Sequence, residues 1–221
     1  MASRRKSTRT RCVFFVRHGE SQSNAGGITM PHADIPLTDR GRAEAVELVS
    51  LLPVRPGKIL SSPFLRAVDT AQPYAERTTA RVELETLLCE FDMIDPALIA
   101  GLNQSQRRPI AENFWHEADP QLQLGNDAET FEYFSRRVRT FTAEALTSLP
   151  HNTVCFGHGI WISMLAWQLL GFPCETSRDM RLFRRFQAGF PIPNGAIYVV
   201  NELRPGEWAL RVASPLRLEK S

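Results

Sequence analysis

Two short apolar runs, one near the start of the chain and one in its last third, each lead into a histidine with glycine beside it. Residues 13–16 are followed by Arg-His-Gly at 17–19, and residues 153–156 by Gly-His-Gly at 157–159. Short, fully apolar runs are typical of strands buried on both faces of a parallel sheet. Because ligands bind beyond the carboxyl ends of such strands, the two histidines are expected to meet at one edge of the sheet.

Between and after these runs the chain alternates strand-like and helix-like patterns. This alternation predicts an α/β fold, a three-layer sandwich whose mostly parallel central sheet has helices on both faces. A final pair of strands is expected to form an antiparallel hairpin at the sheet edge. The expected strands, besides the two above, are 58–60, 81–84, 196–200 and 208–212, and the expected helices begin near Thr38, Arg66, Glu129 and Ile160. The helix from residue 129 is expected to run to 149 on its amphipathic pattern.

The alternation stops between about residues 86 and 128. This stretch is polar and irregular, is broken by prolines and glycines, and has one helix expected near 109–116. Connections of this length are more often functional than idle. We expect a small cap insertion over the site, with a plain long connection as the alternative. Residues 12–221 are then a single domain that includes this cap.

The charge of the chain is uneven. The formal net charge is +2, but residues 1–11 hold five basic side chains and no acidic one, so the rest carries −3. The basic segment is expected to be a disordered, solvated tail. The functional alternative is contact with nucleic acid, a membrane or an acidic partner. No nucleic-acid partner is expected. No membrane partner is expected either, since no apolar run approaches the ~18 residues of a spanning helix.

The four cysteines do not form a metal-binding pattern. Cys12, Cys89, Cys155 and Cys174 include no Cys-x-x-Cys pair, so we expect no zinc site and no cofactor. The segment before residue 13 has no apolar core of the kind that secretory signals carry. Free thiols without such a signal fit a reducing compartment, and a cytoplasmic location is expected.

A third stretch supplies a second arginine. After the strand at 58–60, Ser-Ser-Pro (61–63) opens a helix that carries Arg66 in its first turn. Together with Arg17 and the two histidines it would form a pocket with two fixed cations. Guanidinium groups match phosphate oxygens in a bidentate manner, so the natural ligand is a phosphoryl group. A carboxylate ligand is possible, but it needs less positive charge than this pocket offers.

The phosphoryl chemistry is expected to proceed without a metal. The sequence has no carboxylate cluster for a metal ion and no Gly-x-x-x-x-Gly-Lys-Ser/Thr loop for a nucleotide. The arginines would then supply the charge stabilisation that Mg²⁺ supplies elsewhere. A histidine can act as nucleophile if its imidazole is neutral, and neighbouring guanidinium charges lower its pKa in the required direction.

The three motifs resemble those of the histidine phosphatase superfamily, which includes the cofactor-dependent phosphoglycerate mutases. The resemblance rests on Arg-His-Gly-Glu-Ser-x-x-Asn (17–24), Ser-Ser-Pro-x-x-Arg-Ala-x-x-Thr-Ala (61–71) and the late Gly-His-Gly (157–159), and it covers about residues 13–200. It implies that His18 is the nucleophile that becomes phosphohistidine and that His158 hydrogen-bonds the transferring group.

The resemblance also assigns the remaining roles. Arg17 and Arg66 match the phosphate-binding arginines, and Asn24 matches a polar phosphate contact. The family's general acid is an acidic residue after the third strand. Glu90 matches it best, and Asp92 is the alternative acid. In this assignment the acid protonates the leaving alkoxide and then acts as base toward water.

Three functions remain open. The first is a metal-independent phosphomonoesterase, of the phosphatase branch, that acts on a small phosphorylated metabolite. A phosphoglycerate mutase is the second, but the Glu-Arg-His-Tyr-Gly stretch of the mutases is absent and no lysine stands between Lys58 and Lys220. A non-catalytic phospho-ligand binding module is the third, and the presence of all four core residues argues against it. The protein is expected to be a monomer or homodimer.

Further residues are candidates for the lining of the pocket. His32 could line it, although its loop context favours the surface. The cap candidates are Phe91, Arg107, Arg108, Phe114 and Trp115. Phe114 and Trp115 could equally form the core of the cap.

Overall fold

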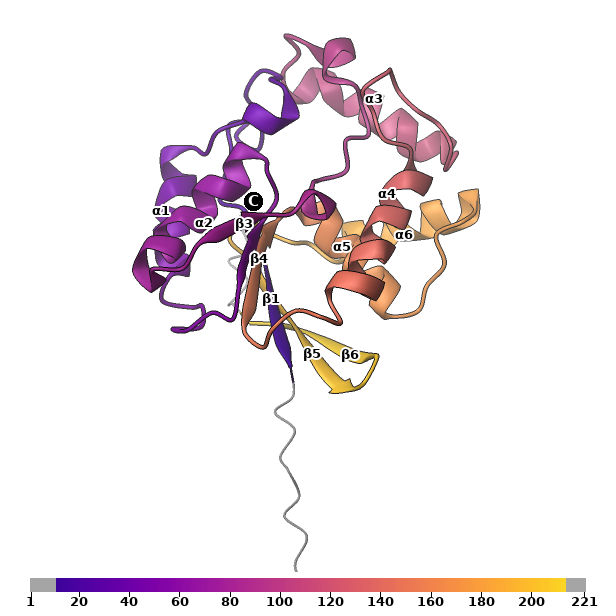
Figure 1. Ribbon diagram of the computed structural model, residues 1–221. Helices are drawn as coiled ribbons and strands as arrows, with labels where there is room; N and C mark the ends of the chain where they lie inside the picture. The colour runs from indigo at the N-terminus through magenta and orange to yellow at the C-terminus, as the bar shows by residue number, and fades with distance from the viewer. Residues whose placement is uncertain (1–10, 214–221) are drawn as a thin grey trace, which may run out of the picture.

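A computed structural model describes residues 11–213 of the chain. Within these residues a six-stranded sheet lies between two layers of helices, as Figure 1 shows. The strands are β1 (Cys12–Arg17), β2 (Ile59–Ser61), β3 (Val82–Leu84), β4 (Thr153–Gly157), β5 (Ile197–Arg204) and β6 (Glu207–Val212).

The sheet is mixed, and its parallel part contains both histidine strands. The strand order is β3-β2-β4-β1-β5-β6. β1 pairs with β4, β4 with β2 and β2 with β3 in parallel, whereas β5 and β6 are antiparallel to their neighbours. The predicted α/β class, the mostly parallel centre and the antiparallel hairpin at the edge are confirmed.

Helices cover both faces of the sheet. The helices α1 and α2 pack on one face, and α4, α5 and α6 pack on the other (Figure 1). The irregular connections contain 3₁₀ turns at His32–Asp34, Thr86–Leu88 and Pro96–Ile99. The helices are α1 (Asp39–Leu48), α2 (Leu65–Thr78), α3 (Gln104–Glu117), α4 (Phe131–Thr140), α5 (Gly159–Leu169) and α6 (Ser177–Gly189).

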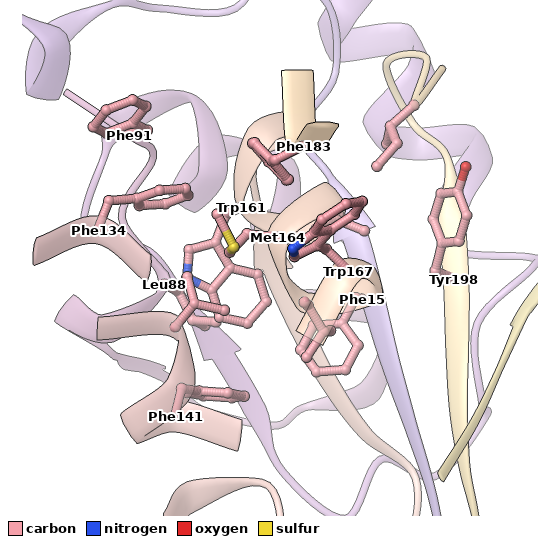
Figure 2. Close-up of a cluster of buried hydrophobic side chains, with 14 of the residues drawn as sticks. Phe15, Leu88, Phe91, Phe134, Phe141, Trp161, Met164, Trp167, Phe183 and Tyr198 are labelled. Carbon is pink, nitrogen blue, oxygen red and sulfur yellow. The ribbon is translucent and has the colours of Figure 1, made fainter. Parts of the chain in front are cut away.

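The period-two pattern of the strands divides the core into two. In β1, Phe15 faces the α4, α5 and α6 side, while Val16 faces α1 and α2. The larger core is rich in aromatic rings, and Figure 2 shows Phe15 among them. The Phe15 and Trp161 rings stack with centroids 5.6 Å apart. Complete burial of one such side chain contributes about 1.5–3 kcal/mol, so this core holds β1 and α5 together.

The single helix predicted for 129–149 is interrupted. The α-helix ends at Thr140, and a π-type turn follows at Phe141–Ala145. The amide of Leu146 donates to the carbonyl of Phe141 at 2.9 Å, which is an i to i+5 bond. The extra residue in this turn lets Phe141 and Leu146 both be fully buried.

The helix α6 was not predicted from sequence. It begins with a capping box in which Thr176 and Asp179 each satisfy the other's backbone amide. Its buried face carries Met180 and Phe183. Arg181, Arg184 and Arg185 lie among these apolar residues, and the helix is amphipathic.

The stretch of residues 86–128 contains α3, which begins earlier than expected. A capping box formed by Asn103 and Gln106 starts the helix at Gln104, ahead of the expected residue 109. In Figure 1 α3 stands beyond the carboxyl ends of the parallel strands. This position is the one from which a cap would reach a ligand at the sheet edge.

The basic tail lies outside the described residues apart from Arg11, which pairs with Glu202 at 3.0 Å. Of the helices in the described part of the chain, none combines the length and apolar character that crossing a bilayer requires. Cys12, Cys89, Cys155 and Cys174 are all free thiols.

Candidate active site

The two histidines meet because their strands are neighbours. β1 and β4 pair in parallel with Arg17 opposite Gly157, so the residues that follow leave the sheet at the same edge. The amide of His18 donates to the carbonyl of Gly157 at 3.0 Å and extends this pairing by one residue. The ring centroids of His18 and His158 lie 5.2 Å apart, and both side chains are buried.

The hydrogen bonds of His18 define its tautomer. Its Nδ1 lies 2.7 Å from the carbonyl oxygen of Gly19, and a carbonyl only accepts, so Nδ1 carries the proton. Its Nε2 accepts from Nε of Arg66 at 3.2 Å and therefore presents a lone pair. Burial lowers the pKa of His18 well below its usual value, and the charges of Arg66 and Arg17 lower it further. The imidazole is neutral, as a nucleophile must be.

Close backbone packing fixes the turn after His18. The amide of Gly19 donates to Oγ1 of Thr70 at 3.0 Å. A Cβ at Gly19 would lie 2.4 Å from the carbonyl oxygen of Gly41, in the first turn of α1. No side chain fits in this space, so glycine is required where the strand turns toward the site.

Arg66 is buried in the first turn of α2. Besides the bond to His18, its Nη1 donates to the carbonyl of His32 at 2.6 Å, and its guanidinium lies 4.9 Å from the centre of the Phe64 ring. Burial lowers the pKa of Arg66 to about 10, opposed by the nearby carboxylates of Glu90 and Asp92. The side chain therefore stays positively charged at neutral pH.

Arg17, the last residue of β1, lines the same cavity as His18 and Arg66. Its Nη1 donates to the carbonyl of Ile192, in the turn before β5. A Cβ on Gly159 would lie 3.3 Å from Nε of Arg17. The glycine after His158 thus leaves room for the guanidinium next to the start of α5.

His158 has one ring nitrogen bonded and one available. Its Nε2 lies 2.8 Å from Oγ of Ser62, and its Nδ1 is buried with no hydrogen-bond partner among the described residues. Burial lowers the pKa of His158 well below its usual value, and the charges of Arg66, His18 and Arg17 add to this effect. Sequence reasoning named Ser62 only as part of a turn. Nothing in the neighbouring sequence indicates its contact with a histidine 96 residues away.

Glu90 lies at the amino end of α5, beside His158. Its carboxylate accepts from the amides of Ile160 and Trp161, each at 3.0 Å, and from its neighbour Phe91 at 3.0 Å. Burial raises the pKa of Glu90, while these amides, Arg66 and Arg17 oppose the rise. The burial effect is the larger, so the carboxyl keeps a proton at higher pH than an exposed glutamate.

Asp92 and His32 form a contact across the mouth of the site. Oδ1 of Asp92 pairs with Nδ1 of His32, and both residues line the same cavity as His18. The expectation of a surface His32 is therefore wrong. The ring is held inward because its backbone carbonyl binds Arg66 and its Nδ1 binds Asp92.

Asn24 lines the cavity and is held there by a local turn with Ser21. Its Oδ1 accepts from Oγ of Ser21 at 3.0 Å and from Nδ2 of Asn194 at 3.0 Å. Nδ2 of Asn194 also lies 3.0 Å from the carbonyl of His18 and 3.1 Å from that of Gly19. Asn194 was not predicted as a site residue, since only its Asn-Gly turn was visible in the sequence.

A cavity of about 250 Å³ is lined by seven of the site residues described above, Arg17, His18, Asn24, His32, Arg66, Glu90 and Asp92, whereas His158 lies behind its wall. Among the cap candidates, Arg107 and Phe91 line it. Arg107 is bonded to Gly27, Thr29, Leu102 and Ser23, all through neutral oxygen atoms. The other three candidates do not line it: Phe114 and Trp115 are buried in the core, and Arg108 pairs with Glu112 at the surface. Over residues 11–213, no cluster of three or more His, Cys, Asp or Glu side chains is placed to hold a metal ion.

A sequence model of the histidine phosphatase superfamily (branch 1) matches residues 13–212. The chain belongs to this superfamily. The adenosylcobalamin/alpha-ribazole phosphatase of Escherichia coli (strain K12) is 31% identical over 179 residues, which cover 77% of this chain and 84% of that protein. A probable phosphoglycerate mutase, GpmB, of Salmonella arizonae is 28% identical, covering 77% of this chain and 80% of the relative.

Solved structures agree with this assignment. The native structure of the mycobacterial glucosyl-3-phosphoglycerate phosphatase superposes with a TM-score of 0.71 at 26% identity, covering 92% of this chain and 98% of that one. The predicted family and α/β fold are confirmed. The family and its phosphatase members support the predicted phosphoric ester hydrolase activity.

Proposed function

We propose that this protein is a metal-independent phosphomonoesterase that hydrolyses a small phosphorylated metabolite through a phosphohistidine on His18. The observation that carries the proposal is the lone pair on Nε2 of His18, a residue that lines the cavity together with Arg17 and Arg66 and whose ring lies 5.2 Å from that of His158. A neutral imidazole with positive charge beside it is suited to attack a phosphate ester.

The phosphoryl group would lie between Arg17, Arg66 and His158. The guanidinium groups would neutralise its oxygens, and Nδ1 of His158, which has no partner in the described residues, would bond one of them. We also propose Asn24 as a polar contact, because it lines the cavity. Nε2 of His18 then attacks phosphorus, the bond to the ester oxygen breaks, and that oxygen leaves with the electron pair.

We propose Glu90 as the acid that protonates the leaving oxygen. Burial raises the pKa of this carboxyl, so it can hold the required proton. Asp92, the alternative, is engaged with His32 farther out in the cavity. In the second step Glu90 takes a proton from water, the water oxygen bonds to phosphorus, and the bond from phosphorus to Nε2 breaks to release phosphate.

Residues 86–128 are proposed to act as a cap that selects the substrate, within a single domain at 12–221. Segments from this stretch, including Arg107 of α3, line the cavity together with His18. A cavity of about 250 Å³ fits a small metabolite better than a protein substrate. The relatives named for ribazole and glucosyl-phosphoglycerate phosphatases are consistent with a substrate of this class.

Mutase-type transfer is the second candidate, because one relative is named a probable phosphoglycerate mutase. It uses the same phosphohistidine and differs only in whether water or a substrate hydroxyl receives the phosphoryl group. The absence of the mutase Glu-Arg-His-Tyr-Gly stretch favours the phosphatase.

We further propose that the protein is a monomer or homodimer. We also propose a cytoplasmic location, since four free cysteines fit a reducing compartment.

The test compares the wild type and His18→Ala on p-nitrophenyl phosphate with EDTA present. Hydrolysis that survives chelation, is lost in the variant and leaves an acid-labile phosphoenzyme supports the proposal. A phosphoglycerate mutase assay runs in parallel, and turnover there would move the function to the second candidate. Phosphate binding without turnover in either assay would favour a binding module and overturn the proposal.

A further inference from the structure

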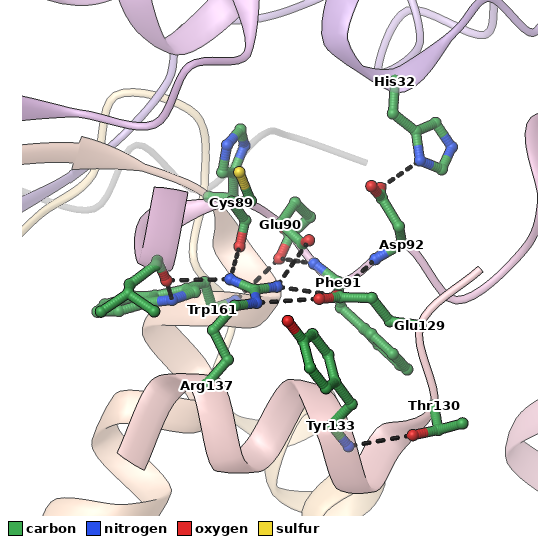
Figure 3. Close-up of polar contacts among 12 residues, drawn as sticks. His32, Cys89, Glu90, Phe91, Asp92, Glu129, Thr130, Tyr133, Arg137 and Trp161 are labelled. Carbon is green, nitrogen blue, oxygen red and sulfur yellow. Dashed lines mark hydrogen bonds and ion pairs between the residues drawn. The ribbon is translucent and has the colours of Figure 1, made fainter. Parts of the chain in front are cut away.

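The segment that carries Glu90 is held by a buried arginine that has no place in the chemistry described so far. Figure 3 shows the side chain of Arg137, from α4, reaching up to Cys89 and Glu90. Its Nη1 donates to the carbonyls of Leu87 at 3.0 Å and Cys89 at 2.8 Å, and its Nη2 donates to the carbonyl of Glu90 at 3.2 Å. One guanidinium therefore fixes three backbone oxygens of the acid-bearing segment.

The same guanidinium is fixed in turn by Glu129. Nε of Arg137 donates to Oε1 at 2.9 Å and Nη2 donates to Oε2 at 2.8 Å, so the pair is bidentate. The side chains of Arg137 and Glu129 are only 7% and 18% exposed. Glu129 also bonds the backbone of Asp92 in both directions, at 2.7 and 3.3 Å. The segment is thus anchored on both sides of Glu90.

All five N–H groups of Arg137 are used in these contacts. A guanidinium is planar, and its donors form a rigid fork, so their acceptors must take up one particular arrangement. Lysine has a single flexible ammonium group and cannot impose the same arrangement. The geometry is therefore specific to arginine rather than to positive charge.

The carboxylate of Glu90 is held separately, by α5. The amides of Ile160 and Trp161 bond its two oxygens, and the indole of Trp161 bonds the carbonyl of Leu87 at 2.6 Å. The backbone of Glu90 is held by α4 and its side chain by α5. A small shift of the backbone would move the carboxyl away from the amino end of α5 and from the ester oxygen.

We propose that Arg137, held by Glu129, is a positioning residue that places the general acid Glu90 against the leaving group. The inference rests on the proposed function, because it requires Glu90 to be the acid. It predicts a defect that depends on the leaving group, since a strongly basic alkoxide needs protonation and p-nitrophenolate does not. A defect of folding alone would affect both kinds of ester equally.

The experiment measures kcat and KM for Arg137→Lys with p-nitrophenyl phosphate and with an alkyl phosphate such as glycerol phosphate. We expect kcat/KM on the alkyl ester to fall roughly 10- to 100-fold and kcat/KM on p-nitrophenyl phosphate to fall less than about threefold. The ratio kcat/KM is compared because it does not include hydrolysis of the phosphoenzyme, a step that Glu90 serves for both esters. Arg139→Lys is the matched control, because Arg139 is exposed on the same helix and pairs with the exposed Glu175. It should leave both reactions unchanged.

Glu90→Gln separates the two ways in which the inference can fail. If Glu90→Gln shows the leaving-group preference and Arg137→Lys slows both esters equally, the positioning role is overturned while the acid role stands. A uniform defect in Glu90→Gln itself overturns the acid role. In the double variant that combines Arg137→Lys with Glu90→Gln, the two losses of activity on the alkyl ester should not be additive. If Arg137→Lys does not fold, Glu129→Gln must show the same preference, and its absence overturns the proposal.

Discussion

Nε of Arg66 donates a hydrogen bond to Nε2 of His18 over 3.2 Å, so the cation that is to bind phosphate already lies on the nucleophilic lone pair. A phosphoryl oxygen must take this guanidinium N–H before the lone pair can reach phosphorus. The same contact keeps the imidazole neutral, because a donor on Nε2 and a positive charge both disfavour the imidazolium form. Binding of the substrate and activation of the nucleophile are therefore coupled.

We expect Arg66→Gln to lower kcat/KM roughly 100- to 1,000-fold, as loss of a charge-stabilising donor does in other enzymes. The charge of Arg66 lowers the pKa of His18, so its removal raises that pKa toward the usual value. The acidic limb of the pH–rate profile should then move to higher pH. The measurement is kcat/KM against pH for both proteins. If the acidic limb of the profile does not move, the protonation of His18 does not determine it.

Removal of the hydroxyl of Ser62 should disturb His158 without touching phosphate. Ser62→Ala leaves the buried Nε2 of His158 without its partner at 2.8 Å, at a cost of about 1–3 kcal/mol in the free energy of unfolding. We expect kcat to fall about tenfold, because the ring loses its orientation. Steady-state kinetics and urea unfolding check both effects. Ser62→Thr, which keeps the hydroxyl, should retain more activity than the alanine variant.

Gly19→Ala should destabilise the protein and inactivate it. The new Cβ would lie 2.4 Å from the backbone oxygen of Gly41, and backbone can yield only by shifting the turn that follows His18. Overpacking of this kind costs about 1–3 kcal/mol. Gly189→Ala is the control, because nothing lies within 4 Å of a Cβ there. Thermal unfolding of the two variants should differ by several degrees, and equal melting temperatures would contradict the packing argument.

The stability of the protein should fall below neutral pH, partly because of His158. Its pKa is below 6.5 in the folded protein and near 6.5 in the unfolded chain, so between these values the unfolded state binds more protons. Stability then falls as pH falls below about 6.5. Between pH 7 and 5 the wild type should lose about 1–2 kcal/mol more than His158→Gln, since each pH unit is worth up to about 1.4 kcal/mol. Urea unfolding at each pH measures this difference. If the free energy of unfolding falls equally with pH in the two proteins, His158 makes no such contribution.

Apart from Glu90, which the family resemblance assigned, the catalytic candidates that sequence reasoning found are those at the ends of strands or in the first turn of a helix. His18 and His158 were visible because a polar residue directly after a buried strand is a local pattern. Arg66 was visible from the Ser-Ser-Pro turn before it. In each case the neighbouring residues on the chain carried the signal.

The residues that were missed act across large sequence separations. Asn194 bonds the carbonyl of His18 from 176 residues away, and Arg137 reaches the carbonyl of Glu90 from 47 residues away. Both bond to main-chain carbonyls, which every residue possesses, so no side-chain pattern marks the acceptor. His32 was misplaced for the same reason, since its loop gives no sign that Arg66 binds its carbonyl.

The position of β1 in the sheet has a consequence for synthesis of the protein. β1 is made first, yet both of its neighbours, β4 and β5, are made last. Until about residue 157 has left the ribosome, this apolar strand has neither edge paired, and until about residue 200 only one edge is paired. An unpaired apolar strand readily joins other chains. We therefore expect a nascent or truncated chain that ends before β4 to aggregate, and the enzyme to depend on chaperones until its last third is complete.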